Sequence, residues 1–476
     1  MTSATAASVR IATTATTTTT ATTTAGPTTT TISDSLAPAG PATPPSSGFR
    51  TAFAALGQAQ FRYYVIGVLI TSTGSWVQRI AQDWLVLTLT NSPTAVGITT
   101  MCQFLPTLVL GLGGGVIADR FPKRAVLSVT MTTMGLLAGV LAVLTLSGNV
   151  QVWHVDVVAV LLGMTIAVDN PTRQSFVTEL APAHQLRSAV SMVSSTFQLG
   201  AMVGPAVSGL LISGVGSGYA FALNGVSYIG ALIALSRIRR GTSAHRDGRA
   251  RELRPAIRYV RDTVTVRWPV ALVGVIGMFT LSLPVTLASF AKSVFQSGSA
   301  GYGLLSSSLA LGSMMGAVLA ARQPRAPRLR ALVGFAAALA TAELVCALAP
   351  TIETFVPLLV VLGASALSFI TTAQSMVQLS TPPGLRGRVL GVYLLVFLGS
   401  GAVGGPLVGW VIDSFGARAG LTLAGTCSAV AAAVLASHLA RTGHLRVRLE
   451  FPARPAEMVS IVGPLEAVDR PHRLPQ

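Results

Sequence analysis

Apolar stretches of about 20 residues recur from residue 61 onward, and they constrain the fold more than any other feature. A helix of about 20 residues is long enough to cross the roughly 30 Å of hydrocarbon in a bilayer. Glycine and proline inside such helices are tolerated because neighbouring helices satisfy the freed backbone groups. The expected spans are 61–88, 94–117, 125–147, 152–170, 188–213, 219–236, 268–290, 299–321, 329–349, 354–376, 387–412 and 418–440. The sequence therefore predicts an all-α polytopic membrane protein with twelve transmembrane helices.

Composition supports this interpretation and excludes a water-soluble enzyme. Apolar residues make up 51% of the chain and charged residues only 10%, whereas soluble proteins carry about a quarter of their residues as charges. The net charge is +17, which in a soluble protein would suggest nucleic acid as a partner. Here the charges sit in short clusters between apolar stretches, so we expect them to orient the chain in the lipid bilayer, and we expect no nucleic-acid partner.

The arginines are concentrated in every second connection between the expected spans. The central segment 237–267 alone holds ten arginines against three acids, whereas the connections near residues 90, 148 and 215 hold none. Lys292 and Arg418 are the main exceptions. Because cytoplasmic loops carry an excess of Lys and Arg, we expect both termini and the central segment on the cytoplasmic side of the inner (cytoplasmic) membrane.

Five segments are expected along the chain. Residues 1–48 are rich in Thr and Ala and contain very few large apolar residues, so they are expected to be disordered. The other four are an N-terminal six-helix bundle (49–236), a basic cytoplasmic central loop (237–267), a C-terminal six-helix bundle (268–440) and a basic cytoplasmic tail (441–476).

The two halves of the chain resemble each other. The runs QSFV and GAMVGPAVSG, which begin at Gln174 and Gly200, recur as QSMV and GAVGGPLVGW, which begin at Gln374 and Gly401. An even number of helices between the repeats keeps their orientation. The pattern predicts two parallel six-helix repeats with a substrate path between them at mid-depth.

Four runs of sequence carry a resemblance to a known family over about residues 50–440. The run GVIADRFPKR, which begins at Gly115, is similar to the signature loop of the major facilitator superfamily. The run QLGAMVGPAVSGLL resembles the motif of the exporters in that superfamily. The runs that begin at Ser75 and Asp169 are similar to the branch of the enterobactin exporter and the macrolide efflux proteins. The resemblance implies a transporter that exports a small organic molecule, such as a drug, siderophore or secondary metabolite, in exchange for protons.

A cytoplasmic gate is expected between the second and third helices. We hypothesise that Asp119 engages the N-terminus of the eleventh helix and the arginines beside it, because a helix N-terminus carries about half a positive charge. This contact would hold the outward-facing state. Alternatively, the basic residues only orient the chain. The gate residues are Gly115, Asp119, Arg120, Lys123, Arg124, Arg386 and Arg388.

The fifth and eleventh helices contain several glycines and one proline each. Glycine lets two helices approach closely, and proline removes a backbone donor and bends the helix. Tight packing and a functional hinge are both compatible with this pattern. The positions are Gly200, Gly204, Pro205, Gly209, Gly405 and Pro406.

Ionisable residues inside apolar spans are the candidates for coupling. Arg79 and Asp83 are four residues apart and share one helix face. One possibility is that they neutralise each other as a structural pair. The alternative is that Asp83 takes up the coupling proton, and that contact with Arg79 controls its pKa and is lost when the two part. Glu343 is a second candidate for the proton carrier. Substrate-cavity candidates in the neighbouring spans are Trp76, Gln78, Gln82, Gln103 and Gln198.

No enzyme, cofactor or metal site is expected. The three cysteines are far apart, no GxxxxGK[ST] nucleotide-binding loop occurs, and catalytic residues do not cluster. The expected partners are a small-molecule substrate, protons and the lipid bilayer, and the expected state is a monomer. The alternatives are an importer or uniporter on the same fold, or a membrane receptor or scaffold that transports nothing.

Overall fold

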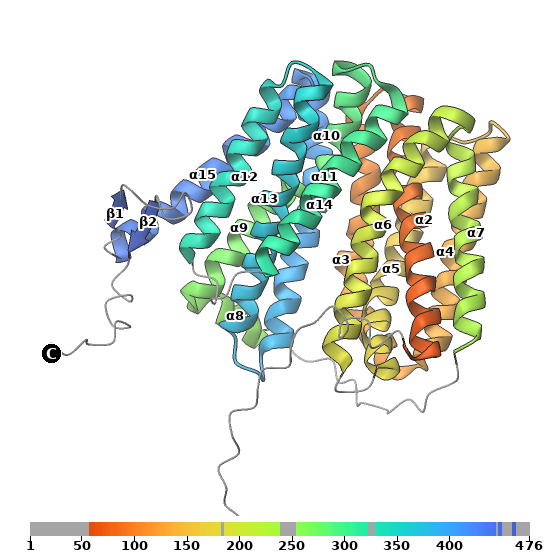
Figure 1. The fold of residues 1–476 in the computed structure, drawn as a ribbon, viewed down its shortest axis with the longest axis horizontal. Coiled ribbons are helices and arrows are strands. Elements are labelled where there is room, and N and C mark those ends of the chain that lie inside the picture. The colour runs from red at the N-terminus through yellow and green to blue at the C-terminus, as the bar shows by residue number, and fades with distance from the viewer. Residues whose placement is uncertain are drawn as a thin grey trace, which may run out of the picture. The chain divides into compact units, whose positions relative to one another are not determined.

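The computed structural model describes residues 57–181, 185–238, 254–321, 329–443, 446–449 and 459–462. The expected N-terminal tail (1–48), residues 239–253 of the central loop and most of the C-terminal tail lie outside these residues. The first set of helices comprises α2 (Ala59–Thr90), α3 (Pro93–Arg120), α4 (Lys123–Leu146), α5 (Val152–Leu180), α6 (Leu186–Val215) and α7 (Ser217–Ser236). Figure 1 shows these six helices gathered on the right.

The second set begins after a short helix, α8 (Arg254–Asp262). Its first membrane-length segment is built from α9 (Val264–Leu281), α10 (Leu283–Ser289) and the π-helix η3 (Phe290–Val294). The remaining helices are α11 (Gly298–Ala321), α12 (Leu329–Leu348), α13 (Ile352–Leu379), α14 (Arg386–Phe415) and α15 (Ala417–Gly443). The chain continues into two short antiparallel strands, β1 (Arg446–Leu449) and β2 (Val459–Val462), which lie within the segment expected as a basic tail.

The expected spans agree with the observed helices, and two differences have physical causes. Eleven segments of the described residues are long and apolar enough to cross a membrane. The twelfth, α2, has 32 residues but is less apolar because it carries Arg79, Asp83 and several other polar residues. Helix α5 continues to Leu180, well beyond the expected end at residue 170. The expected end of this span was therefore too early, because the charge of Arg173 hid the continuation of the helix.

The two sets meet along two helix pairs, α3 with α14 and α6 with α11. Along the antiparallel pair α3 and α14, the closest backbone contacts lie toward one end. A methyl group placed on Gly405 would lie 2.6 Å from the carbonyl oxygen of Gly97, so the two backbones touch there. Further along, Gly399 approaches only the side chain of Leu108. A methyl group on Gly115 would meet nothing within 4 Å among the described residues. The two helices therefore diverge.

We call the end where the sets touch the closed end. It carries the connections at residues 91–92, 216, 295–297 and 416. The pair α6 and α11 touches near the same end, where a methyl group on Gly303 would lie 2.6 Å from the carbonyl oxygen of Pro205. The opposite end carries the connections that follow α3, α5, α7, α11 and α13.

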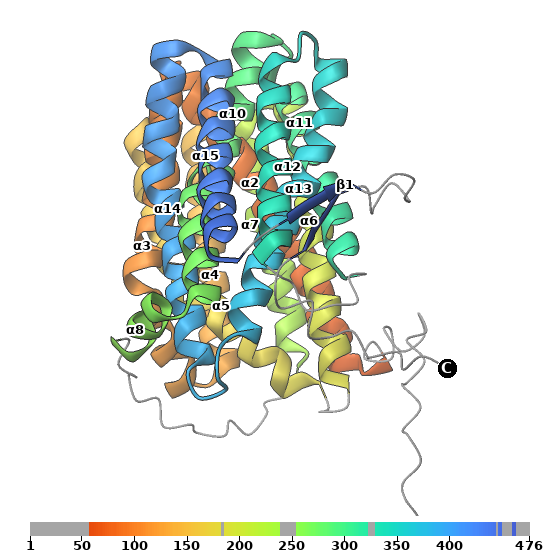
Figure 2. The ribbon, with the colours of Figure 1, turned by 90° about the vertical axis from the view of Figure 1, so that its left-hand side faces the viewer.

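Helix α8 lies at the opposite end, beside α9 and the start of α14 (Figure 2). Its apolar face is buried through Ala256 and Val260, and the hydroxyl of Tyr259 donates to the carbonyl oxygen of Ser380 at 2.6 Å. Its arginines are exposed, and Arg254 and Arg258 line a surface hollow of about 340 Å³ with Leu385. The central segment is therefore anchored to the second set at this point.

Candidate functional site

Asp83 of α2 lies at the boundary between the two helix sets. Its side chain is only 6% exposed, and the hydroxyl of the fully buried Tyr302 on α11 donates a hydrogen bond to Asp83 Oδ2 at 3.0 Å. The ring of Trp84 stacks on Tyr302 with 6.1 Å between the ring centres. A carboxylate of the first set is thus joined to a hydroxyl of the second.

Arg79 lies one helical turn from Asp83 on the same face of α2. The two form no ion pair in this structure; the ion pairs formed by the described residues join Lys123 to Glu179 and Arg173 to Asp169. Instead, the guanidinium carbon of Arg79 lies 5.8 Å from the ring centre of Trp76 and 5.2 Å from that of Phe104 on α3. The structure therefore holds Arg79 and Asp83 apart.

The four glutamines proposed for the cavity occupy different environments. Gln78 is buried, and its Oε1 accepts a hydrogen bond at 2.6 Å from Nδ2 of Asn224 on α7, so its amide joins two helices of the first set. Gln82 is also buried, and its Oε1 has no hydrogen-bond partner among the described residues. Gln103 and Gln198 are half-buried on α3 and α6. The boundary between the sets therefore does not use the Gln78 amide.

Glu343 lies within the second set. It is fully buried on α12, which packs against α13 and α15, and neither carboxylate oxygen has a hydrogen-bond partner in the described part of the chain. Burying a carboxylate without partners is costly. The geometry keeps Glu343 as a candidate proton carrier, although it separates Glu343 from the Asp83 contact.

Three of the proposed gate residues at the opposite end, Lys123, Arg124 and Arg386, have partners within their own sets. Lys123 pairs with Glu179, and Arg124 Nη2 donates to the carbonyl oxygen of Ser236 at 3.1 Å. The other placements follow. Arg386 Nη2 donates to the carbonyl oxygen of Thr381 at 3.5 Å, Arg388 Nε is buried with no partner in the described segments, Arg120 is exposed, and the side chain of Asp119 lies outside what the structure describes.

The glycines of α6 divide between two neighbours. Methyl groups on Gly200 and Gly204 would lie 2.5 Å from side-chain atoms of Ser72 and Trp76, so this part of α6 packs on α2. Gly209 instead meets the backbone of α11, where a methyl group would lie 2.9 Å from the carbonyl oxygen of Ser299. Gly405 and Pro406 are the counterparts of Gly204 and Pro205 in the sequence repeat, and they pack against the backbone of α3 at Gly97.

Two charged side chains of the second set bind helix termini of the first set at the closed end. The Asp413 carboxylate accepts hydrogen bonds from Ser92 Oγ at 2.7 Å and from the backbone N–H of Thr94 at 3.0 Å, at the N-terminus of α3. Lys292 Nζ donates to the carbonyl oxygen of Leu87 at 2.7 Å, in the last turn of α2. Each charge has the sign that complements its helix terminus.

Sequence reasoning missed both of these contacts. Lys292 carried a signal, because it was one of two exceptions to the charge distribution across the bilayer. Its hydrogen bond to the C-terminal end of α2 explains why a lysine stands at this position.

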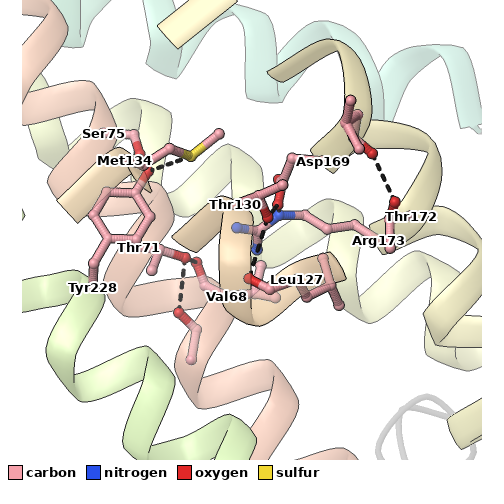
Figure 3. A network of polar contacts seen from close by, with 12 residues as sticks. Val68, Thr71, Ser75, Leu127, Thr130, Met134, Asp169, Thr172, Arg173 and Tyr228 are labelled. Atoms are coloured by element: carbon pink, nitrogen blue, oxygen red, sulfur yellow. Dashed lines mark hydrogen bonds and ion pairs between the residues drawn. The ribbon is translucent and has the colours of Figure 1, made fainter. Parts of the chain in front are cut away.

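A second missed feature is a buried ion pair inside the first set, shown in Figure 3. Arg173 pairs with Asp169 one turn away on α5, and Thr130 Oγ1 on α4 donates to Asp169 Oδ1 at 2.7 Å. The side chains of Arg173 and Asp169 are 19% and 5% exposed. The spacing of four residues was the signal that could have found this pair.

The described residues contain no group of three or more His, Cys, Asp or Glu side chains placed to hold a metal ion. The chemistry offered by the structure is instead a boundary between two helix sets, with charged and aromatic side chains near its middle and helix-capping charges at one end. The description "Transmembrane secretion effector" belongs to a family model of the major facilitator superfamily that matches residues 50–457.

The chain belongs to this family.

One relative of this transporter is named as an efflux pump and another as a siderophore transporter. It is 26% identical to the multidrug efflux pump Tap of Mycolicibacterium fortuitum over 369 residues, which cover 75% of this chain and 90% of that protein. It is 27% identical to the staphyloferrin A transporter of Staphylococcus aureus over 173 residues, which cover 36% of this chain and only 44% of that protein. The chain is therefore a multi-pass membrane transporter of the major facilitator superfamily, and not an enzyme.

Solved structures of this superfamily share the fold. A bacterial homologue of the lysosomal transporter Spinster matches with a TM-score of 0.65 at 15% identity, covering 81% of this chain and 96% of that one. The nucleoside transporter NupG matches with a TM-score of 0.63 at 13% identity, covering 80% of this chain and 98% of that one. These structural similarities show a shared fold, and they do not identify the substrate of this chain.

Proposed function

We propose that this transporter exports a small organic molecule across the cytoplasmic membrane by alternating access, in exchange for protons. The observation that carries the proposal is the contact between the two helix sets, which is made at the closed end and absent between Gly115 and α14. A membrane protein whose halves touch at one end only can expose its middle to one side at a time. The names of the relatives, Tap above all, favour export.

The arginine distribution supports a proposed orientation of the two ends in the membrane. The arginine-rich connections follow the helix termini at the opposite end, so the positive-inside rule places that end in the cytoplasm. In this proposal both termini are cytoplasmic, and the bundles of residues 49–236 and 268–440 move relative to each other as a monomer. The structure then corresponds to a state that loads its substrate from the cytoplasm.

Asp83 is the proposed proton carrier. As a carboxylate it accepts the hydrogen bond of Tyr302, which favours closure toward the outside. A proton taken up from the outside removes its negative charge, and release of that proton to the inside restores the bond. Glu343 is the second candidate, because it is buried without a hydrogen-bond partner among the described residues.

Expression in an efflux-deficient bacterial host is expected to raise resistance to part of a panel of antibiotics and siderophore-like compounds. A protonophore should abolish the effect, because it removes the proton gradient. Asp83→Asn, which keeps the hydrogen-bonding shape and removes the titrating group, should reduce active export to the level seen with the protonophore. The measurement is efflux of the responsive compound from preloaded cells, with Arg62→Gln, an exposed arginine at the start of the same helix, as the control.

Three outcomes would count against this proposal. Accumulation of the compound in intact cells would indicate an importer on the same fold. Efflux that persists with the protonophore would remove the coupling to protons. A folded protein that moves no compound of the panel, and still functions when its two bundles are crosslinked, would favour a receptor or scaffold.

The two gates are expected to respond in opposite directions to loss of a carboxylate. Asp413→Asn weakens the contact with the N-terminus of α3 and should favour opening of the closed end, whereas Asp119→Asn should favour the state described here. Exposed charges at helix termini contribute about 0.3–1 kcal/mol, so each balance should shift by about two- to fivefold.

Spin-label distances can measure both shifts. One label pair at Val215 and Leu348, which are 54% and 77% exposed, reports the closed end. A second pair at Ser236 and Leu379 reports the opposite end. Cys102, Cys346 and Cys427 would first be replaced. Shifts in the same direction for both variants would contradict the assignment of two opposed gates.

A further inference from the structure

The face of α2 that carries Asp83 points toward the second helix set. Asp83 bonds Tyr302 across the boundary, and Trp76, Arg79 and Asp83 lie on one stripe because they are three and four residues apart. The stripe continues from the closed end toward the middle of α2. Phe104 of α3 marks the same boundary, since a methyl group on Gly401 of α14 would lie 3.4 Å from its ring.

Arg79 forms no direct ion pair on this stripe, although Asp83 is one turn away. It makes no hydrogen bond or ion pair with any residue that the structure describes, and its nearest contacts are the faces of two aromatic rings, Trp76 and Phe104. Its nitrogen atoms are not among the buried polar atoms that lack a partner, so they remain accessible. The five N–H donors of a guanidinium lie in its plane, and stacking on ring faces leaves them unused.

A cation in the middle of a membrane span is costly unless it is compensated. Contacts with aromatic faces compensate this cost only in part, because they leave the N–H donors of the guanidinium without acceptors. Asp83 is one turn away but is engaged with Tyr302, so it does not fill this role here. The site that remains is a planar cation beside aromatic surface, near the middle of the boundary between the two sets.

We propose that Arg79 binds a negatively charged group of the transported molecule, a carboxylate or a comparable planar oxyanion. The rings of Trp76, Phe104 and Phe197 bind the apolar or aromatic part of the same molecule. Phe197 of α6 contributes because its ring lies 6.1 Å from that of Trp76 and is 50% exposed. This inference rests on the proposed transport function and narrows its substrate class to organic anions that carry an apolar or aromatic portion.

Three probes with one ring system and different charges test the inference. They are 2-naphthoate, its neutral amide 2-naphthamide, and the cation 2-naphthylmethylammonium. Binding to the purified full-length transporter in detergent is measured by isothermal titration. The wild-type protein should bind the carboxylate most tightly. Arg79→Gln should weaken carboxylate binding by about tenfold to a hundredfold, the range for a hydrogen bond between charged groups, and leave amide binding unchanged.

Additional variants separate a binding role from a structural one. Arg79→Lys keeps the charge and loses the planar fork, so it should retain part of the preference for the carboxylate. Asp83→Asn should raise carboxylate affinity, because it removes the negative charge one turn from Arg79. Arg62→Gln on the same helix should change nothing. Thermal unfolding of each variant verifies that it is folded.

Equal binding of the three probes by the wild-type protein would overturn the inference. So would an equal loss of all three in Arg79→Gln, because that indicates a structural role. The outcome is separable from that of the proposed function, since binding in detergent needs neither a gradient nor a direction. Arg79-dependent binding without export from everted vesicles would leave the inference standing and remove the export proposal. Export of a responsive compound that Arg79→Gln does not alter would remove the inference alone.

Discussion

Arg173→Met is expected to lower the free energy of unfolding by roughly 3–5 kcal/mol, the usual cost of removing one partner of a buried ion pair. The substitution leaves the Asp169 carboxylate, whose side chain is 5% exposed, with the hydroxyl of Thr130 as its remaining side-chain partner. Reversible unfolding in mixed micelles with increasing dodecyl sulfate measures the loss.

The double variant Asp169→Leu/Arg173→Met should recover most of this stability. Replacing a buried ion pair by apolar residues of similar volume is often neutral or stabilising. The Thr130 hydroxyl is not left unsatisfied, because the carbonyl oxygen of Leu127 lies 3.2 Å from it. The repeat in the second set already has this arrangement, since the positions 200 residues further on hold the buried residues Phe369 and Ala373.

Glu179→Gln supplies the matched control on the same helix. Glu179 on α5 forms an ion pair with Lys123 on α4. The side chains of Lys123 and Glu179 are 16% and 26% exposed. Removing a more exposed pair typically costs about 0.2–1 kcal/mol. A stable double variant that no longer transports would assign the buried pair a functional role as well. A single variant as stable as the wild-type protein would contradict the structural role.

The spans and the family could be predicted from the sequence because both depend on local patterns. The length of an apolar run sets whether a helix crosses the bilayer, and motifs such as the one that begins at Gly115 are continuous in the chain. Error arose where a charge interrupted a helix, as at Arg173, because hydropathy alone ends a span at its last apolar residue.

The partners of the candidate residues could not be predicted in the same way. Helical periodicity places Arg79 and Asp83 on one face, but it does not say which helix packs against that face. Tyr302 is 219 residues from Asp83, and Asn224 is 146 residues from Gln78. Only the packing of the helices decides that Asp83 reaches the second set while Gln78 stays inside the first.

Gly97→Ala is expected to open the closed end and to slow transport strongly. A methyl group on Gly97 would overlap the carbonyl group of Gly405 and lie 2.9 Å from the backbone nitrogen of Pro406. Backbone atoms of α14 cannot rotate away as a side chain can, so α3 and α14 must separate. Overpacking of this kind costs about 1–3 kcal/mol, which corresponds to a shift between the two states of about five- to 150-fold.

Gly139→Ala makes the same chemical change on α4, where a methyl group would meet nothing within 4 Å. Because alanine favours a helix over glycine by roughly 0.5–1 kcal/mol, this control should be neutral or slightly stabilising and should transport normally. The label pair at Val215 and Leu348 should report a longer distance in Gly97→Ala only. If Gly97→Ala keeps both the wild-type distance and the wild-type transport rate, the backbone contact between α3 and α14 is not the one that closes this end. The contacts of α6 with α11 would then have to hold the two helix sets together without it.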